Sequence, residues 1–179
     1  MKATGIVRRI DDLGRVVIPK EIRRTMRIRE GDPLEIFTDR EGEVIFKKYS
    51  PIGELNAYAT HCADTLNKTG DLPVVICDRD EVVACAGVSK RDFMERRISE
   101  EAEHLADMRS LYVHKPGDPF LGVVDSISEW QISCLMPIIT EGDVVGFVAA
   151  LTAADKVVPD VEVQLVRTAA LFLSKIIEN

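Results

Sequence analysis

The sequence has no apolar run long enough to cross a membrane. A membrane-spanning helix needs about 20 mainly apolar residues in succession, and charged or polar side chains interrupt this chain before any run reaches that length. The first residues, Met1-Lys2-Ala3-Thr4-Gly5, also lack the apolar run of a signal peptide. We therefore expect a cytoplasmic protein.

Cysteine is scarce and shows no metal-binding pattern. The four cysteines lie 15, 8 and 49 positions apart, and each falls in an apolar run: Cys62, Cys77, Cys85 and Cys134. No Cys-x-x-Cys pair is present, and His104 and His114 share no metal-like spacing with any cysteine. The sequence predicts buried, reduced thiols, no metal site and no cofactor, with these histidines at the surface or in loops.

Positive charge is concentrated at the N-terminal end. Residues 1–50 hold 12 Lys and Arg against 9 Asp and Glu, whereas residues 51–179 hold 11 against 21, so that net charges of +3 and −10 make up the total of −7. A basic segment joined to an acidic one is typical of a nucleic-acid-binding head on a partner or sensor domain. A solvated charged face has the same composition. We place the domain boundary between residues 50 and 51.

Residues 14–27, GRVVIPKEIRRTMR, form the most informative stretch. Five of its fourteen residues are Arg or Lys, and only Glu21 is acidic. Pro19 favours the first position of a helix, where its missing N–H would lack a partner anyway. The helix carries arginines on one face and apolar side chains on another: Arg23, Arg24 and Arg27 against Ile22 and Met26.

Residues 1–50 together predict a small sheet domain. Strands are expected at residues 3–10, 15–18, 34–37 and 43–49, with the helix between the second and third. Glycine-containing turns are expected at residues 11–14 and 39–42. Because even about 60 residues enclose only a marginal core, we expect this domain to complete its core with a second copy of the chain.

Four motifs in this segment resemble a known family. They are TGIVRR at 4–9, DxGRVVIP at 12–19, ExRR at 21–24 and GDxLEI at 31–36. In this order and register they are similar to the DNA-binding domain of AbrB-type transition-state regulators. The resemblance implies a swapped-hairpin β-barrel, a homodimer in which two chains interleave their hairpins into one unit that binds double-stranded DNA.

The resemblance also implies which side chains contact DNA. Matched position by position, the family's arginines fall on Arg8, Arg15, Arg23 and Arg24. We add three helpers on charge alone: Lys2, Arg9 and Arg27. Guanidinium groups suit this role because they bind phosphates bidentately and reach guanine edges in the major groove. The implied function is transcription regulation of sporulation-stage genes at the nucleoid, and activation and repression both stay open.

Residues 51–179 predict alternating helices and strands. We expect a helix at 51–68, a hairpin at 73–86, two short helices after Ser89 and Ser99, a second hairpin at 131–151 and a long helix at 160–179. Two long helices thus bracket a central antiparallel sheet. This order resembles a GAF sensor domain, so the predicted fold class is α+β: a swapped-hairpin barrel followed by a GAF-like domain.

The GAF resemblance implies further properties of residues 51–179. GAF domains commonly pair through their terminal helices, so the expected assembly is a homotetramer. A small-molecule effector in this fold would lie between the sheet and residues 87–125, and the sequence leaves its existence and identity open. Arg91, Arg109 and Asp125 are candidate pocket residues, although lone charges are more often solvated.

Two other functions stay open beside the regulator. An antitoxin shares the swapped-hairpin head, but antitoxins usually end in a short disordered tail, whereas residues 51–179 show regular apolar periodicity. A GAF-type cysteine-dependent reductase would use Cys77, Cys85 or Cys134, but burial within a strand raises the pKa of a thiol. The sequence therefore favours a regulator that is not an enzyme.

Overall fold

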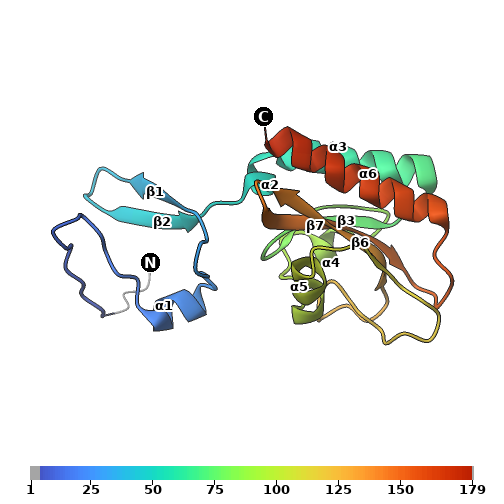
Figure 1. The fold of residues 1–179 in the computed structure, drawn as a ribbon, viewed down its shortest axis with the longest axis horizontal. Coiled ribbons are helices and arrows are strands. Elements are labelled where there is room, and N and C mark those ends of the chain that lie inside the picture. Colours follow the sequence, from blue (N-terminus) through green and yellow to red (C-terminus); the bar gives the residue numbers. More distant parts are fainter. Residues whose placement is uncertain (1–4, 179) are drawn as a thin grey trace. The chain divides into compact units, whose positions relative to one another are not determined.

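The computed structural model describes residues 5–178 and divides the chain into two compact units, residues 1–49 and residues 50–179. The first unit contains α1 (Lys20–Thr25), β1 (Leu34–Thr38) and β2 (Val44–Lys48) (Figure 1). Among the described residues, no helix is both long and apolar enough to span a membrane.

The β1–β2 hairpin closes on an aspartate-centred turn. The strands pair antiparallel, with Ile36 opposite Phe46. Asp39 Oδ1 accepts hydrogen bonds from the backbone N–H groups of Glu41 (3.0 Å) and Glu43 (2.9 Å). Gly42 has φ +85°, a left-handed conformation that glycine adopts without strain. An aspartate followed three residues later by glycine therefore makes this turn.

Residues 11–15 form a second turn of the same construction. Asp11 Oδ1 accepts from the N–H groups of Leu13 (3.0 Å) and Arg15 (2.8 Å), and Gly14 has φ +77°. The Asp11 N–H donates to the Arg15 carbonyl at 3.0 Å, as the Asp39 N–H does to the Glu43 carbonyl at 3.2 Å. The described part of the first unit thus contains two turns of this construction, at residues 11–15 and 39–43.

The strands expected on either side of this second tip are not formed within the chain. Residues 5–10 and 15–18 carry no strand, and residues 3 and 4 of the expected first strand lie outside the described residues. A strand needs a hydrogen-bonded partner, and the described part of this chain supplies only the tip. The expectation of strands at 3–10 and 15–18 was therefore wrong for a single chain.

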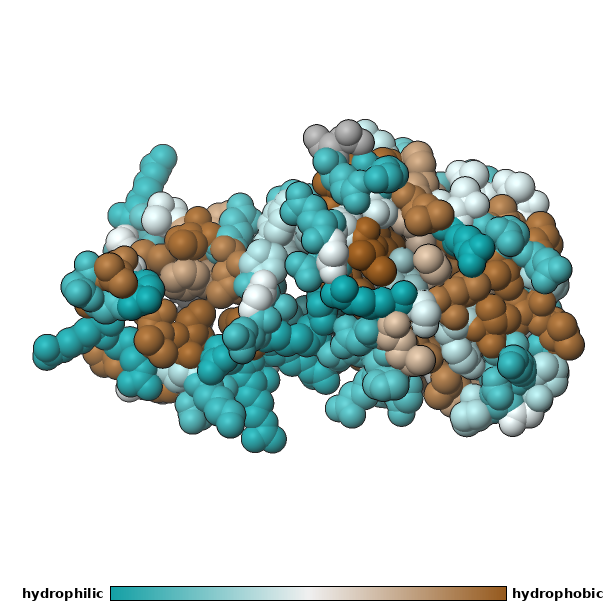
Figure 2. Space-filling view, viewed as in Figure 1, coloured by the Kyte–Doolittle hydropathy of each residue, from teal (hydrophilic) through white to brown (hydrophobic). Residues whose placement is uncertain are grey.

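Apolar side chains of the first unit face outward. Pro19 is the one buried residue among those described in this unit. Val7 is 85% exposed, Val17 69% and Ile36 61%. Figure 2 shows such hydrophobic groups at the surface. The exposed large hydrophobic residues among those described in this unit are Ile6, Val7, Ile10, Leu13, Val16, Val17, Met26, Ile36, Phe37, Val44, Phe46 and Tyr49.

The second unit is built on a five-stranded antiparallel sheet. Its strand order is β4-β3-β7-β6-β5. The strands are β3 (Val74–Asp78), β4 (Val82–Ala86), β5 (Tyr112–Val113), β6 (Gln131–Thr140) and β7 (Asp143–Thr152). The helices are α2 (Pro51–Glu54), α3 (Asn56–Gly70), α4 (Lys90–Phe93), α5 (Glu100–Asp107) and α6 (Asp160–Ile177).

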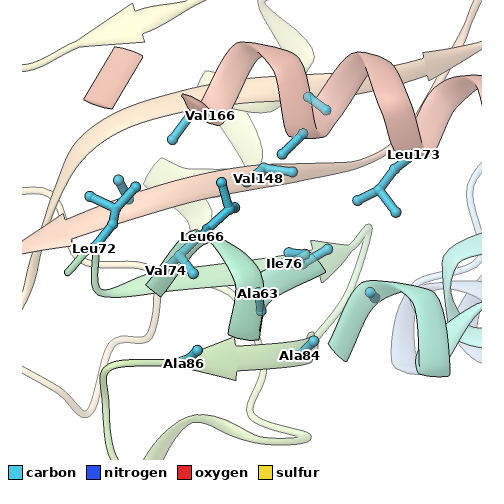
Figure 3. Close-up of a cluster of buried hydrophobic side chains, with 14 of the residues drawn as sticks. Ala63, Leu66, Leu72, Val74, Ile76, Ala84, Ala86, Val148, Val166 and Leu173 are labelled. Atoms are coloured by element: carbon cyan, nitrogen blue, oxygen red, sulfur yellow. The ribbon is translucent and has the colours of Figure 1, made fainter. Parts of the chain in front are cut away.

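Helices cover both faces of this sheet. The two long helices, α3 and α6, pack side by side on one face (Figure 1). Figure 3 shows their side chains, among them Leu66 and Leu173, meeting Val74, Ile76 and Val148 of the sheet. On the other face, α4, α5 and the following loop pack against Val75, Phe147 and their neighbours. Because both faces are buried, the central strands read as unbroken apolar runs.

The helix expected at residues 51–68 is two helices that meet at Leu55. Ser50 caps α2, because its Oγ accepts from the Gly53 N–H at 3.0 Å and donates to Asp78 Oδ2 at 2.8 Å. Ile52 is 1% exposed and packs over Gly146 of β7. These two contacts fix the short helix α2 to the end of the sheet.

Gly146→Ala should destabilise the second unit. A Cβ at this position would lie 2.1 Å from the Cys77 carbonyl oxygen and 2.5 Å from Ile52 Cδ1, so backbone and α2 must both shift. We expect a loss of about 3 kcal/mol in the free energy of unfolding, measured by urea denaturation with Trp130 fluorescence. Gly122→Ala is the matched control, since its Cβ meets its nearest atom at 3.4 Å. Equal midpoints for the two variants would contradict this prediction.

Candidate nucleic-acid interface

Helix α1 presents two arginines of the sequence motif. Pro19 is buried, and its carbonyl accepts the first helical hydrogen bond from the Arg23 N–H at 2.9 Å. Arg23 and Arg24 are both exposed. Ile22, on the opposite face, is half-buried. The proline that starts the helix and the isoleucine that packs it therefore leave both guanidinium groups accessible.

Arg15 is held by the aspartate of its own turn. The Arg15 Nε donates to Asp11 Oδ2 at 2.8 Å, while the arginine side chain stays 70% exposed. Hydrogen bonds from the Arg15 N–H and then from its guanidinium lower the pKa of Asp11 below its usual value. The carboxylate is therefore ionised at neutral pH and orients the arginine through Nε. The sequence reasoning missed this role of Asp11, although its place three residues before Gly14 is the signal.

Two of the other predicted contacts lie before the turn at Asp11. Arg8 and Arg9 are exposed in the segment that leads into the turn at Asp11. Lys2 lies outside the described residues. The structure thus brings Arg23 and Arg24 together on α1 and places Arg8 and Arg15 on either side of one turn.

Arg27 ends helix α1. Its backbone takes φ +49°, its N–H donates to the Arg24 carbonyl at 3.3 Å, and the Ile28 N–H donates to the Arg23 carbonyl at 2.8 Å. These two bonds define a Schellman motif with Arg27 in the position that glycine usually takes. The Arg27 carbonyl also accepts from Lys48 Nζ at 3.0 Å, and its side chain is half-buried. Arg27 therefore terminates the helix.

The cysteines offer no reactive thiolate. Cys77, Cys85 and Cys134 are buried and Cys62 is half-buried, all as free thiols. Burial raises the pKa of each thiol, that of Cys134 to about 12 and that of Cys77 well above its usual value. A nucleophilic cysteine needs a lowered pKa and access to solvent. The arrangement therefore does not suit cysteine-dependent catalysis.

The space between the sheet and residues 87–125 is filled by apolar side chains. Phe93, Ile98 and Leu105 from this segment pack against Val75 and Phe147 of the sheet. A cleft beside α5, lined by Asp78, Arg79 and Asp107, has an interior of about 10 Å³, near the least that holds one water molecule. The candidate pocket residues Arg91, Arg109 and Asp125 are all exposed. The segment thus packs its apolar side chains against the sheet where the pocket was expected.

His114 was expected at the surface or in a loop; it lies in the loop after β5, but it is buried. The histidine is 3% exposed, and its Nε2 lies 2.8 Å from Asp155 Oδ1. Asp155 also accepts from the Gly117 N–H. This contact joins two loops, and among the described residues no group of His, Cys, Asp and Glu could hold a metal ion.

Comparison with known families divides the chain at nearly the same place as the two units. Residues 54–178 match a family model described as the C-terminal domain of stage V sporulation protein T, a transcription factor. Residues 7–53 match a model described as the antidote-toxin recognition domain of the bacterial antitoxin MazE. Over 180 positions, the whole of both chains, the sequence is 51% identical to stage V sporulation protein T of Bacillus subtilis (strain 168).

Two further comparisons concern the separate units. Over 51 residues the chain is 63% identical to the transition state regulatory protein AbrB of Bacillus subtilis (strain 168). This alignment covers 28% of this chain and 52% of AbrB. The cofactor-binding GAF domain of the nutrient sensor CodY from Clostridium difficile matches at 11% identity and a TM-score of 0.50, over 65% of this chain and 83% of that domain. The AbrB-type and GAF-like resemblances are confirmed.

Cys77 and Cys134 should resist thiol reagents while the protein is folded. Only the thiolate attacks, and because burial raises the pKa of both groups, they stay protonated at about pH 8.5, where an ordinary thiol is half ionised. We expect labelling by a disulfide reagent to begin with half-buried Cys62 and to include Cys77 and Cys134 only after unfolding in urea. Rapid labelling of folded protein in which Cys62 and Cys85 are both replaced by serine would contradict this.

Proposed function

Because this chain belongs to the family of stage V sporulation protein T and is a DNA-binding transcription regulator, we propose that its first unit binds double-stranded DNA as a swapped-hairpin dimer. We further propose that the second unit joins two such dimers, and that the protein acts at the nucleoid in the cytoplasm on sporulation-stage genes. The observation that carries this proposal is that the first unit exposes its arginines and its apolar hairpin side chains together.

The exposed apolar side chains support dimerisation. The turns at residues 11–15 and 39–42 are formed, but residues 5–10 and 15–18, on either side of the former, carry no strand. A second copy supplies strand partners and cover for the apolar side chains, because its hairpins pair with residues 5–10 and 15–18 and cover side chains such as Val7 and Val17. Burying this apolar area stabilises the dimer by about 25 cal/mol for each Å² removed from water.

The arginines suit a DNA contact surface. Arg8, Arg15, Arg23 and Arg24 are exposed, and Asp11 orients Arg15 without covering its terminal nitrogens. Arg9 and Lys2 are proposed helpers, and Arg27 contributes its charge from the helix end. If all eight arginines of a dimer contacted phosphate, the slope of log affinity against log salt concentration would be about −7. Fewer phosphate contacts would make the slope shallower.

The outer face of α6 supports further assembly. Val161, Leu171 and Phe172 are 66%, 55% and 53% exposed, and helical spacing places them on one side of the helix. Tyr58 on the neighbouring helix α3 is 54% exposed. Exposed apolar groups clustered on two adjacent helices favour pairing with a second copy. Dimerisation through the first unit and pairing through α6 together produce a homotetramer.

An effector is not part of this proposal. The expected pocket beneath residues 87–125 is occupied by the protein's own apolar side chains, so a ligand would require α4 and α5 to move. The high cysteine pKa values likewise weigh against the reductase alternative.

Toxin neutralisation is the second candidate function, and the match of residues 7–53 to an antitoxin model favours it. The folded second unit weighs against it, because residues 50–179 form a compact domain. A neighbouring gene whose product is toxic alone and harmless when this chain is co-expressed would support the antitoxin role. Absence of such a gene leaves the regulator.

Arg24→Ala should weaken DNA binding without dissociating the dimer. The substitution removes two exposed guanidinium groups per dimer, so the affinity should fall by roughly 30-fold at physiological salt and the salt slope should become shallower by about 1.8. Fluorescence anisotropy with a duplex of about 30 base pairs, three helical turns, measures both, and sedimentation measures the assembly.

Arg40→Ala is the matched control for this experiment. Arg40 is an exposed arginine in the β1–β2 turn and carries the same charge outside the proposed contact set. Affinity and slope that stay at wild-type values in Arg24→Ala, Arg23→Ala and Arg15→Ala would overturn the proposed DNA surface.

Replacing Leu171 and Phe172 together by glutamate should reduce the assembly from four chains to two. Charged side chains in the proposed helix interface oppose its burial, whereas the first unit keeps its own dimer contact. Sedimentation equilibrium reports the mass, and Met108→Glu, an exposed apolar position at the end of α5 that is 58% exposed, is the control. An unchanged mass would show that α6 is not the second interface.

A further inference from the structure

Lys20 is a cation in the proposed DNA-binding unit to which no role has yet been given. It is the first residue of α1 and is exposed. Within the part of the chain that the structure describes, its ammonium group has neither a hydrogen bond nor an ion pair. A lysine with its charge fully in solvent is a common surface feature, so its position on the helix decides what it can do.

Lys20 shares a face with the two arginines of α1. An α-helix turns by about 100° per residue, which places Arg23 about 60° to one side of Lys20 and Arg24 about 40° to the other. Ile22, which packs against the unit, faces away from them. The ammonium group therefore stands between two exposed guanidinium groups and extends their surface toward the start of the helix.

The position is electrostatically unfavourable for lysine in the protein alone. Helix N-termini carry partial positive charge and favour acidic side chains, and Pro19 at the cap position offers no side-chain hydrogen bond. Arg23 and Arg24 one turn away add like charge. A residue that costs stability where it stands, without a compensating contact in the described chain, indicates a function outside the free protein.

We propose that Lys20 is a DNA-phosphate contact, in addition to the four arginines, and that it gives the α1 face its third cation. The inference rests on the proposed function. A phosphate placed against this face would meet Lys20, Arg23 and Arg24 and would relieve the repulsion among them. Lysine supplies a point charge without bidentate geometry, so its contribution is to affinity and salt dependence, and it does not select bases.

The test compares Lys20→Gln with Lys156→Gln in the full chain. Lys156 is an exposed lysine in the loop after β7 of the second unit, so both variants lose the same charge. For Lys20→Gln we expect a loss of DNA affinity of about 5- to 30-fold and a salt slope shallower by about 1 to 2, against a duplex of about three helical turns. Lys156→Gln should leave both at wild-type values.

Thermal unfolding separates a binding role from a structural one. Lys20→Gln removes a cation from a helix N-terminus, so its Tm should equal or exceed that of the wild type, while Lys20→Arg should restore DNA affinity and slope. Weaker binding together with a lower Tm and an unchanged slope would mean a structural role and would overturn the inference. Affinity and slope equal to those of Lys156→Gln would also overturn it.

Arg24→Ala in the same titrations distinguishes a failure of the Lys20 inference from a failure of the proposed DNA surface. If Arg24→Ala weakens binding and Lys20→Gln does not, the inference about Lys20 fails and the proposed DNA surface stands. If neither variant weakens binding, the inference about Lys20 fails, and unchanged binding in Arg23→Ala and Arg15→Ala as well would show that the surface itself is wrong.

Discussion

The structure depends on one constraint, which is that the described residues of the first unit leave most of their apolar side chains exposed. The valines on either side of the turn at residues 11–15 are exposed, and residues 5–10 and 15–18 carry no strand. Removing apolar surface from water is the dominant favourable term in folding and association. The same short segment carries the exposed arginines, so the proposed dimer contact and the proposed DNA surface belong to one unit.

Turn chemistry places the cations on this unit. Asp11 and Asp39 build two turns of one design, but only the first is followed by an arginine, whose Nε the aspartate holds. Pro19 starts α1 and Arg27 ends it in a left-handed conformation, so Arg23 and Arg24 lie on a helix of fixed length. Arginine adopts that conformation at some cost, which the two hydrogen bonds of the helix end offset.

The second unit differs from the first in that its own side chains fill its core. Its sheet is covered on both faces, and the space in which GAF domains hold ligands is filled here by Phe93, Ile98 and Leu105. Such close packing leaves little room for an effector. Among the apolar groups that the unit leaves exposed are Val161, Leu171 and Phe172 on the outer face of α6, the face proposed to pair with a second copy.

The sequence by itself determined the two domains, most strands and helices, and the arginine motif, because these follow from local periodicity, turn residues and charge. It did not determine that residues 51–68 break at Leu55, that α3 and α6 share one face, or that His114 is buried against Asp155. Those features depend on contacts between residues far apart in the chain. The structure also showed three local features that the sequence reasoning had not named: Arg27 ends α1, Asp11 orients Arg15, and Lys20 lies on the same face of α1 as Arg23 and Arg24. The local sequence pattern identifies the candidate side chains, but packing determines which of them face outward together.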